Sequence, residues 1–200
     1  PFLILQQVDS TNNYATALLH EGMAHHGTVV FAFEQTKGKG QRHKHWLSAK
    51  NENITVSIIL QNINLPISAG FLLSMSIAVA ALRFFKQYTT NCLIKWPNDI
   101  ILNDRKAGGI LIENIVQGPL WRYAIVGIGI NINQTRFEGL PNPVSLKQIT
   151  GEDFNTIELA KELCVFIQKG FETFMTDAPA VHQDYQQHLY KMGEAVKLKQ

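Results

Sequence analysis

The sequence predicts an α+β fold in which a mixed, largely antiparallel sheet is flanked by helices. Short runs rich in β-branched and aromatic residues alternate with turns of Gly, Pro, Asn and Asp, a pattern typical of β-hairpins. Longer stretches of small and apolar residues carry a helical period. With 200 residues, of which 46% are hydrophobic, the chain is long enough to bury one full core. We therefore expect one principal domain, without internal repeats.

The first third of the chain predicts a strand, a helix and two further strands. Residues 2–5 are a short apolar run, and the polar residues 9–12 can cap a helix that continues to Leu19. β-branched and aromatic residues at 28–33 and 53–60 predict two strands that enter and leave a long loop. The polar cluster at 9–12 therefore lies where a strand passes into a helix.

The middle of the chain predicts a core helix followed by hairpins. Residues 68–88 contain no Gly or Pro after Gly70 and are mostly small or apolar, as in a buried helix. Strands at 93–96 and 99–103 are separated by Pro97. Two longer hairpin strands are expected at 107–116 and 120–133, with a turn at 118–119.

The last third predicts two helices and then a new strand. Helical periodicity marks residues 157–175 and 180–190. Residues 194–199 alternate as a strand does, but no partner strand follows them. A strand without a partner indicates a missing continuation of the chain.

Charge and hydropathy argue against a nucleic-acid-binding or membrane-spanning protein. The net charge is only +2, whereas nucleic-acid-binding domains usually carry a basic face over much of their surface. The most apolar stretch, residues 69–85, contains Ser74, Ser76 and Arg83 and is shorter than the roughly 20 residues that a bilayer-spanning helix needs. No secretory signal pattern stands at the start. We therefore read the stretch at 69–85 as core.

The cysteines and histidines predict neither a disulfide framework nor a metal centre. Cys92 and Cys164 lie far apart in apolar surroundings, which predicts buried thiols in a reducing cytoplasm. The same surroundings disfavour a nucleophilic cysteine, which needs an electropositive, partly exposed setting. His43 and His45 lack neighbouring Cys or carboxylate ligands. The sequence therefore assigns no metal ligands.

The most distinctive local feature is a basic, glycine-containing run at residues 34–46. Five of the 18 Lys and Arg residues lie within fourteen positions, namely Lys37, Lys39, Arg42, Lys44 and Lys50. Gly38 and Gly40 allow backbone conformations that turn N–H groups toward an anion while the cations neutralise it. Trp46 offers a flat face to a planar ring. Taken alone, the run is equally well explained by a solvated surface loop.

Three further strings place polar chemistry at the ends of strands and helices. Residues 95–99 read Lys-Trp-Pro-Asn-Asp, which puts Lys95 at a strand end, although a surface lysine beside an Asx turn is the better explanation when the string is taken alone. Residues 9–12 need no ligand if they only cap a helix. Residues 127–131 read Gly-Ile-Gly-Ile-Asn, so one face of that strand lacks side chains and admits either another backbone or a ligand.

Together, and in their order along the chain, the four strings resemble those of biotin–protein ligases. These enzymes activate biotin with ATP and transfer it to a lysine of a carrier domain. The matching positions are Ser10, Thr11, Asn12, Gln35, residues 38–42, Trp46, Asn53, residues 95–99 and residues 129–131. The resemblance spans about residues 9–133. It implies the fold of biotin/lipoate ligases, which is similar to class II aminoacyl-tRNA synthetase catalytic domains.

The resemblance also implies a biotin site, a nucleotide site and catalytic cations. The implied biotin-binding residues are Ser10, Thr11, Asn12, Gln35, Gly38, Lys39, Lys95 and Gly109. The implied nucleotide-binding residues are Lys39, Arg42, Trp46, Asn53, Lys95 and Asn131. Lys95, Arg42 and Lys39 are the implied catalytic residues, because joining a carboxylate to the α-phosphate of ATP brings two anions together.

The resemblance extends to substrates, partners and domains. Biotin and ATP, the latter with Mg²⁺, are the implied substrates of a biotin–[acetyl-CoA-carboxylase] ligase, and a biotin carboxyl carrier domain is the implied partner. Residues 1–190 would be the catalytic domain and 191–200 the start of a truncated C-terminal β domain. No helix-turn-helix precedes Phe2, so DNA binding is not implied. A cytoplasmic protein that does not bind membranes is expected, and a homodimer is left open.

Two positions depart from the family pattern, and two other functions stay open. Lys39 stands where Arg is usual, and Lys cannot form the bidentate fork of Arg with phosphate. His43 stands where Gly is usual, and His tolerates positive φ better than most residues. The alternatives are a lipoate–protein ligase or octanoyl transferase on the same general fold, and a non-catalytic anion-binding module that uses the basic loop and Trp46.

Overall fold

The computed structural model describes residues 1–61, 63–117, 120–139 and 142–195. The strands are β1 (Phe2–Leu5), β2 (Thr28–Ala32), β3 (Asn53–Gln61), β4 (Cys92–Lys95), β5 (Asp99–Leu102), β6 (Arg105–Gln117) and β7 (Leu120–Asn131). The helices are α1 (Thr11–His20), α2 (Gly70–Phe85), α3 (Leu146–Thr150), α4 (Thr156–Thr176) and α5 (Ala178–Gln187). Two short 3₁₀ helices are η1 (Gln41–His43) and η2 (Ile67–Ala69).

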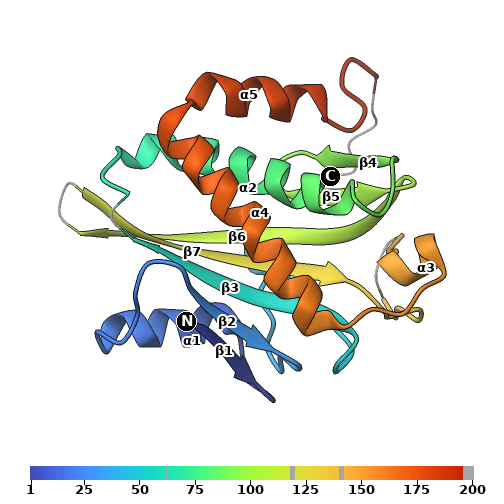
Figure 1. Ribbon diagram of the computed structural model, residues 1–200, viewed down its shortest axis with the longest axis horizontal. Helices are drawn as coiled ribbons and strands as arrows, with labels where there is room; N and C mark the ends of the chain where they lie inside the picture. The colour runs from blue at the N-terminus through green and yellow to red at the C-terminus, as the bar shows by residue number, and fades with distance from the viewer. Residues whose placement is uncertain (62, 118–119, 140–141, 196–200) are drawn as a thin grey trace.

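These strands form one seven-stranded sheet with the order β1-β2-β3-β7-β6-β5-β4. β1 pairs with β2 in parallel, and every other described pair of neighbours is antiparallel. Figure 1 shows α2, α4 and α5 on one side of the sheet and α1 on the other. The predicted α+β fold, with a mixed and largely antiparallel sheet flanked by helices, is therefore confirmed.

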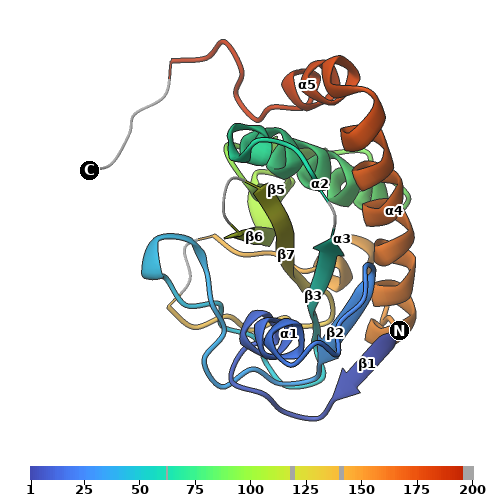
Figure 2. The same ribbon diagram turned by 90° about the vertical axis from the view of Figure 1, so that its left-hand side faces the viewer.

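The sequence of β3 explains why one face of the sheet is apolar and the other partly polar. Side chains alternate along a strand, so Asn53, Thr55, Ser57 and Ile59 point to one face and Ile54, Val56 and Ile58 point to the other. The apolar face packs against α2 and α4 in the main core. The other face packs against α1 through a smaller cluster of Ala15, Leu18, Val30, Ile59 and Ile125. Figure 2 shows α1 and the loop after β2 together on this second side.

Most predicted elements are confirmed, with small shifts of their ends. β7 ends at Asn131 instead of 133, and α5 begins at Ala178 instead of 180. α3 is an element that the sequence analysis misses. Its five residues are too few to show a helical period, and a capping box stabilises it: the Ser145 hydroxyl accepts from Gln148 N, and Gln148 Oε1 accepts from Ser145 N.

The predicted second domain stays a prediction. Residues 196–200 lie outside the described part of the chain, as do the turn at 118–119 and residues 140–141 of the Pro-rich loop. Glu194 and Ala195, which are described, do not belong to a strand.

α2 is the central core helix of the fold. Together with η2 it forms an apolar helical stretch, Ile67–Phe85, whose 19 residues are long and apolar enough to cross a membrane by length and composition alone. The sequence argument from length is therefore too strict. In the fold, 56% of the most apolar 18-residue segment of this stretch is buried, and α2 packs against α4, α5 and the sheet. Burial in the core accounts for its composition.

Both cysteines are free thiols in apolar surroundings, as the sequence predicts. Cys92 is buried and Cys164 is partly buried. Burial raises the pKa of each thiol from 9.0 to about 12. Burial likewise raises the pKa of Tyr88 and Tyr185 from 10.0 to about 12. These groups therefore keep their protons in the folded protein at pH values where the unfolded chain has lost them.

The free energy of unfolding is expected to fall as the pH rises above 9. In this window the unfolded thiols are deprotonated and the folded ones are not, so each thiol favours unfolding by about 1.4 kcal/mol per pH unit. Urea denaturation at several pH values checks this. A Cys92→Ala variant should show a shallower loss, and a wild-type stability that stays constant between pH 9 and pH 11 would contradict the expectation.

Candidate functional site

Five neighbouring strands form one row across the sheet that contains Lys95 and two glycines. The register places Lys95 opposite Asp99, Asp99 opposite Gly109, Gly109 opposite Gly129, and Gly129 opposite Thr55. Residues directly opposite each other in antiparallel strands share a face. Lys95 therefore lies on the same face as the glycines of β7 and the polar positions of β3.

Side chains from other elements fill the space above the glycines of β7. A Cβ atom at Gly127 would lie 2.3 Å from Asn12 Oδ1, and one at Gly129 would lie 2.3 Å from Trp46 Cε2. The prediction that this gap admits another backbone or a ligand is therefore wrong. The glycines serve instead to bring the start of α1 and the indole ring of Trp46 down onto the sheet.

The polar residues at the start of α1 do not act as a helix cap. Ser10 is the N-cap residue, but its side chain makes no capping hydrogen bond. Gln35 Oε1 accepts from Thr11 N at 2.7 Å and lies 3.1 Å from Thr11 Oγ1. Ser57 Oγ lies 2.7 Å from Thr11 Oγ1 and 2.5 Å from Asn12 Oδ1. The buried side chains of Thr11 and Asn12 thus join a polar network, which removes capping as their explanation.

Glu113 of β6 connects this network to the basic loop. Asn12 Nδ2 donates to Glu113 Oε2 at 2.7 Å. Lys39 Nζ donates to Glu113 Oε1 at 3.1 Å in an ion pair whose side chains are 40% and 36% exposed. The carboxylate thus lies between a residue predicted to bind biotin and one predicted to bind phosphate.

The basic loop is shaped by close packing and not by positive φ angles at its glycines. The sequence argument relies on such angles at Gly38 and Gly40, and neither glycine has one. A Cβ atom at Gly38 would lie 2.5 Å from Trp46 O, so the glycine allows the two arms of the loop to approach. A positive φ within the loop is at Arg42 (55°).

Two predicted catalytic cations remain without partners. Lys95 and Arg42 are exposed, and neither makes a hydrogen bond or ion pair within the described residues. The turn beside Lys95 is nevertheless well held. Asn98 Nδ2 donates to Ile110 O at 2.7 Å, and Asp99 pairs with Lys106 at 2.7 Å. Because both side chains reach β6, the Asx-turn explanation of this string is wrong.

The end of α5 supports the same turn from the other side. Tyr185, which is 2% exposed, donates its hydroxyl to Pro97 O at 3.0 Å. Ile94 N donates to His188 O at 2.9 Å, and Tyr190 N donates to Ile94 O at 2.8 Å. Residues after α5 thus continue the sheet at the outer edge of β4, next to Lys95.

Asn53 and Asn131 face each other across β3 and β7 and are almost fully buried. Asn53 Nδ2 donates to Ser48 Oγ at 3.0 Å and to Gln134 Oε1 at 2.5 Å, so neither amide hydrogen is free for a ligand. Asn131 Nδ2 donates to Val144 O at 3.1 Å, whereas its Oδ1 is buried without a described partner. Asn131 therefore keeps a free acceptor, and Asn53 ties the segment before β3 to the segment after β7.

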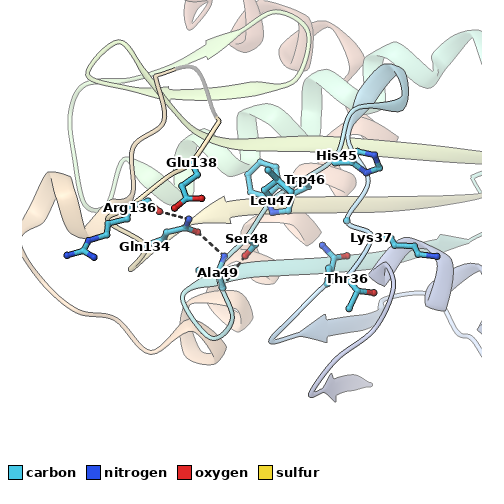
Figure 3. A pocket seen from close by; sticks show the side chains of 12 residues that line it. Thr36, Lys37, His45, Trp46, Leu47, Ser48, Ala49, Gln134, Arg136 and Glu138 are labelled. Atoms are coloured by element: carbon cyan, nitrogen blue, oxygen red, sulfur yellow. Dashed lines mark hydrogen bonds between the residues drawn. The ribbon is translucent and has the colours of Figure 1, made fainter.

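A pocket of about 460 Å³ opens between the basic loop and the segment after β7 (Figure 3). Gln35, Gly38 and Trp46 line one wall, and Gln134 and Glu138 line the other. The buried indole Nε1 of Trp46 has no described partner. The other predicted site residues lie outside the pocket lining, namely Ser10, Thr11, Asn12, Lys39, Arg42, Asn53, Lys95, Gly109 and Asn131.

The structure adds five polar residues that the sequence analysis does not select: Ser48, Ser57, Lys106, Glu113 and Gln134. A signal exists for two of them. Glu113 is the sole acid between residues 107 and 116, and alternation from Gly109 places it on the glycine face. Ser57 follows Asn53 in the same way along β3. Gln134 depends on the path of a loop, which no local pattern reveals.

Comparison with known proteins gives the following similarities. The model of the biotin/lipoate A/B protein ligase family matches residues 4–131. The chain is 32% identical over 180 residues to the bifunctional ligase/repressor BirA of Bacillus spizizenii, covering 87% of this chain and 55% of BirA. It is 25% identical over 199 residues to the biotin–[acetyl-CoA-carboxylase] ligase of Mycobacterium tuberculosis, covering 98% and 73%. The chain thus spans about half the length of the Bacillus relative.

Solved structures give the same picture. Biotin protein ligase from Aquifex aeolicus in complex with biotin and ATP is similar with a TM-score of 0.78 at 26% identity, over 96% of this chain and 80% of that one. The ligase from Leishmania major in complex with biotinyl-5-AMP has a TM-score of 0.79 at 23% identity, over 100% and 84%. The second likeness concerns the fold alone. Both agree with the fold type that the sequence resemblance implies.

Proposed function

Because the chain belongs to the biotin/lipoate A/B protein ligase family, we propose that it joins biotin to ATP as biotinyl-5′-AMP and then transfers biotin to a lysine of a biotin carboxyl carrier domain. The observation that carries this proposal is the shared face of the sheet. Lys95, the glycines of β7, the polar start of α1 and the basic loop meet on that face. Helix capping and an Asx turn, which would explain two of these strings without a ligand, do not describe the contacts made.

We assign biotin to the residues that the family pattern implies: Ser10, Thr11, Asn12, Gln35, Gly38, Lys39, Lys95 and Gly109. The ureido ring of biotin is neutral, so it needs hydroxyl and amide partners. Thr11 Oγ1 donates to Gln35 Oε1 at 3.1 Å, and its own lone pairs can accept from a ring N–H. Gly109 leaves room for the apolar tail on this face, and the row continues through Asp99, which pairs with Lys106, to the Lys95 cation.

We assign the nucleotide to Lys39, Arg42, Trp46, Asn53, Lys95 and Asn131. Trp46 lines the pocket and offers its ring to adenine. The unpartnered Trp46 Nε1 and Asn131 Oδ1 supply one donor and one acceptor. The role of Asn53 is indirect, because both of its amide hydrogens already bond to Ser48 and Gln134. It holds these two side chains in place.

Two displacement steps follow from these assignments. A biotin carboxylate oxygen attacks the α-phosphorus of ATP, the new P–O bond forms, and pyrophosphate leaves with the electrons of the broken bond. The amine of the carrier lysine then attacks the acyl carbon and loses a proton, and AMP leaves. The first step joins two anions, so positioning and charge neutralisation supply the catalysis. Lys95 and Arg42 are free for this role, and Lys39 joins them after leaving Glu113.

We propose that Mg²⁺ arrives with ATP as the substrate complex. Within the described residues, no group of three His, Cys, Asp or Glu side chains could hold a metal ion. Mg²⁺ often takes its ligands from substrate phosphates and one or two carboxylates, and Glu113 and Asp99 lie on the same face. The reducing cytoplasm is the compartment that we propose, since both described thiols are free.

A lipoate–protein ligase or octanoyl transferase is the second candidate, because the matching family model covers biotin and lipoate enzymes together. A cysteine nucleophile is disfavoured, since burial raises the pKa of both thiols to about 12. The non-catalytic anion-binding module is the third candidate. Such a module would use the basic loop and Trp46, and it gives no role to Lys95, which has no partner among the described residues.

Acid-dependent exchange of labelled pyrophosphate into ATP separates the three candidates. The purified protein is given Mg·ATP with biotin, with lipoate, with octanoate, or with no acid. We expect exchange with biotin alone. Exchange with lipoate or octanoate but not with biotin would favour the second candidate. Absence of exchange with every acid, together with binding of polyanions, would favour the third.

A further inference from the structure

The turn that connects β4 to β5 follows directly after Lys95 and is held from two sides. From β6, Ile110 O accepts from Asn98 Nδ2 at 2.7 Å, and Ile110 N donates to Asn98 O at 3.1 Å. From α5, the hydroxyl of Tyr185 donates to Pro97 O at 3.0 Å. Proline has no N–H, so its carbonyl is the one main-chain group through which a hydrogen bond can hold the turn at this residue.

The hydroxyl of Tyr185 is placed by a rigid support. The side chain is only 2% exposed. Its ring makes an edge-to-face contact with the ring of Phe71 in α2, with 6.3 Å between the centroids. The preceding residue, Asp184, forms an ion pair with Arg83, also in α2. A group held by packing and by an ion pair next to it can fix the position of what it contacts.

The end of α5 also holds the chain on the other side of Lys95. Ile94 N donates to His188 O at 2.9 Å, and Tyr190 N donates to Ile94 O at 2.8 Å. Lys95 therefore lies between two residues, Ile94 and Pro97, whose main chains are bonded to α5 or to the segment that follows it. The side chain of Lys95 itself has no partner among the described residues, so its direction depends on the main chain that carries it.

We propose that Tyr185 is a positioning residue for the formation of the adenylate. Its hydroxyl fixes the main chain at Pro97 and thereby directs Lys95 over the glycine face, where the two anions are joined. Tyr185 acts through Lys95 and does not touch the substrates. The inference rests on the proposed function, because it concerns the reaction in which Lys95 takes part.

Tyr185→Phe tests the inference directly. The variant keeps the buried ring and its contact with Phe71 but removes the donor to Pro97 O. We expect the single-turnover rate of biotin adenylate formation, at saturating biotin and Mg·ATP, to fall about 5- to 50-fold. The reason is that a displacement of about 1 Å at a reacting group can cost about 100-fold in rate.

Tyr88→Phe is the matched control. Tyr88 is also a partly buried tyrosine whose hydroxyl donates a hydrogen bond, in this case to Glu162 Oε2 at 2.9 Å. That bond joins the segment after α2 to α4 and does not involve the turn beside Lys95. Tyr88→Phe should therefore keep the wild-type rate.

A double-mutant cycle with Lys95→Ala separates positioning from a merely structural role. If Tyr185 acts only through Lys95, the variant Lys95→Ala/Tyr185→Phe should form the adenylate as fast as Lys95→Ala alone. A structural role would lower the active fraction in both backgrounds by the same factor. If Tyr185→Phe does not fold, Asp184→Ala, which loosens α5 from α2, takes its place in the same cycle.

The outcomes distinguish this inference from the proposed function. A wild-type protein without biotin-dependent pyrophosphate exchange would reject the function itself. If the wild type exchanges, a folded Tyr185→Phe variant with the wild-type rate of adenylate formation would overturn only the role of Tyr185. An equal loss of rate with and without Lys95 would overturn that role as well.

Discussion

Replacing Lys95 with alanine is expected to lower the rate of biotin adenylate formation about 100- to 1,000-fold, while the fold remains intact. Removing one preorganised charge from a site that joins two anions costs roughly 3–4 kcal/mol of barrier, by analogy with oxyanion-stabilising donors. The fold should tolerate the change, because Lys95 is exposed and has no ion pair among the described residues. Single-turnover formation of the adenylate, measured by chromatography, gives the rate, and circular dichroism gives the stability.

Lys161→Ala is a matched control for this experiment. Lys161 is also an exposed lysine, but it lies on α4, on the opposite side of the sheet, where it pairs with Glu158. Its removal should leave adenylate formation unchanged. If Lys95→Ala retained a rate near that of the wild type, Lys95 would be a solvated lysine at a strand end and the proposed mechanism would lose its main cation.

Gly129→Ala is expected to raise the KM for ATP about 10- to 100-fold and to lower the free energy of unfolding by about 1–3 kcal/mol. The added methyl group would lie 2.3 Å from Trp46 Cε2 and 2.7 Å from Trp46 Cδ2, closer than carbon atoms approach in proteins. The indole ring must therefore leave the sheet. If Trp46 supports adenine, the nucleotide loses its platform, and steady-state exchange kinetics with ATP varied will detect this.

Gly109→Ala controls for the change of a glycine to alanine in a strand. Gly109 lies directly opposite Gly129 on the same face, but its added methyl group would be 3.5 Å from the nearest atoms, Asp99 Oδ1 and Lys106 Nζ. It should keep wild-type stability and a wild-type KM for ATP, so that any effect falls on the KM for biotin. An unchanged KM for ATP in Gly129→Ala would show that Trp46 is not the nucleotide platform.

Local sequence patterns predict the fold and the side of the sheet that carries the site. In β3, polar Asn53, Thr55 and Ser57 alternate with apolar residues, and this period of two survives in the structure because both faces of the strand are covered. The order of the four strings along the chain is equally local information. These patterns suffice to choose the family and to predict the sheet.

Contacts between distant residues could not be predicted in the same way. Glu113 meets Asn12 across 101 positions of sequence, and that meeting depends on the register of β6 against β7. The register shifts between Ile115 and Val116, so counting back from the turn would put side chains on the wrong face. The polar network around Asn12 therefore becomes visible only in three dimensions.

Two of the wrong interpretations concern what occupies the space around glycines. A strand pattern such as that at 127–131 shows where a side chain is missing, but not which element fills the space. Here Asn12 and Trp46 fill it. Gly38 is needed because the backbone at Trp46 lies close to it, which is again a contact between two arms of a loop. Intrinsic backbone freedom was the available explanation from sequence, and close packing is the physical one.

A crystal structure of the protein with bound biotinyl-5′-AMP tests the central claim most directly. We predict density on the α1 side of the sheet, with the ureido ring within hydrogen-bonding distance of Thr11 and Gln35. The phosphate should lie near Lys95, and adenine should lie against Trp46. Density for the adenylate on the opposite side of the sheet, for example among α2, α4 and α5, would contradict the account.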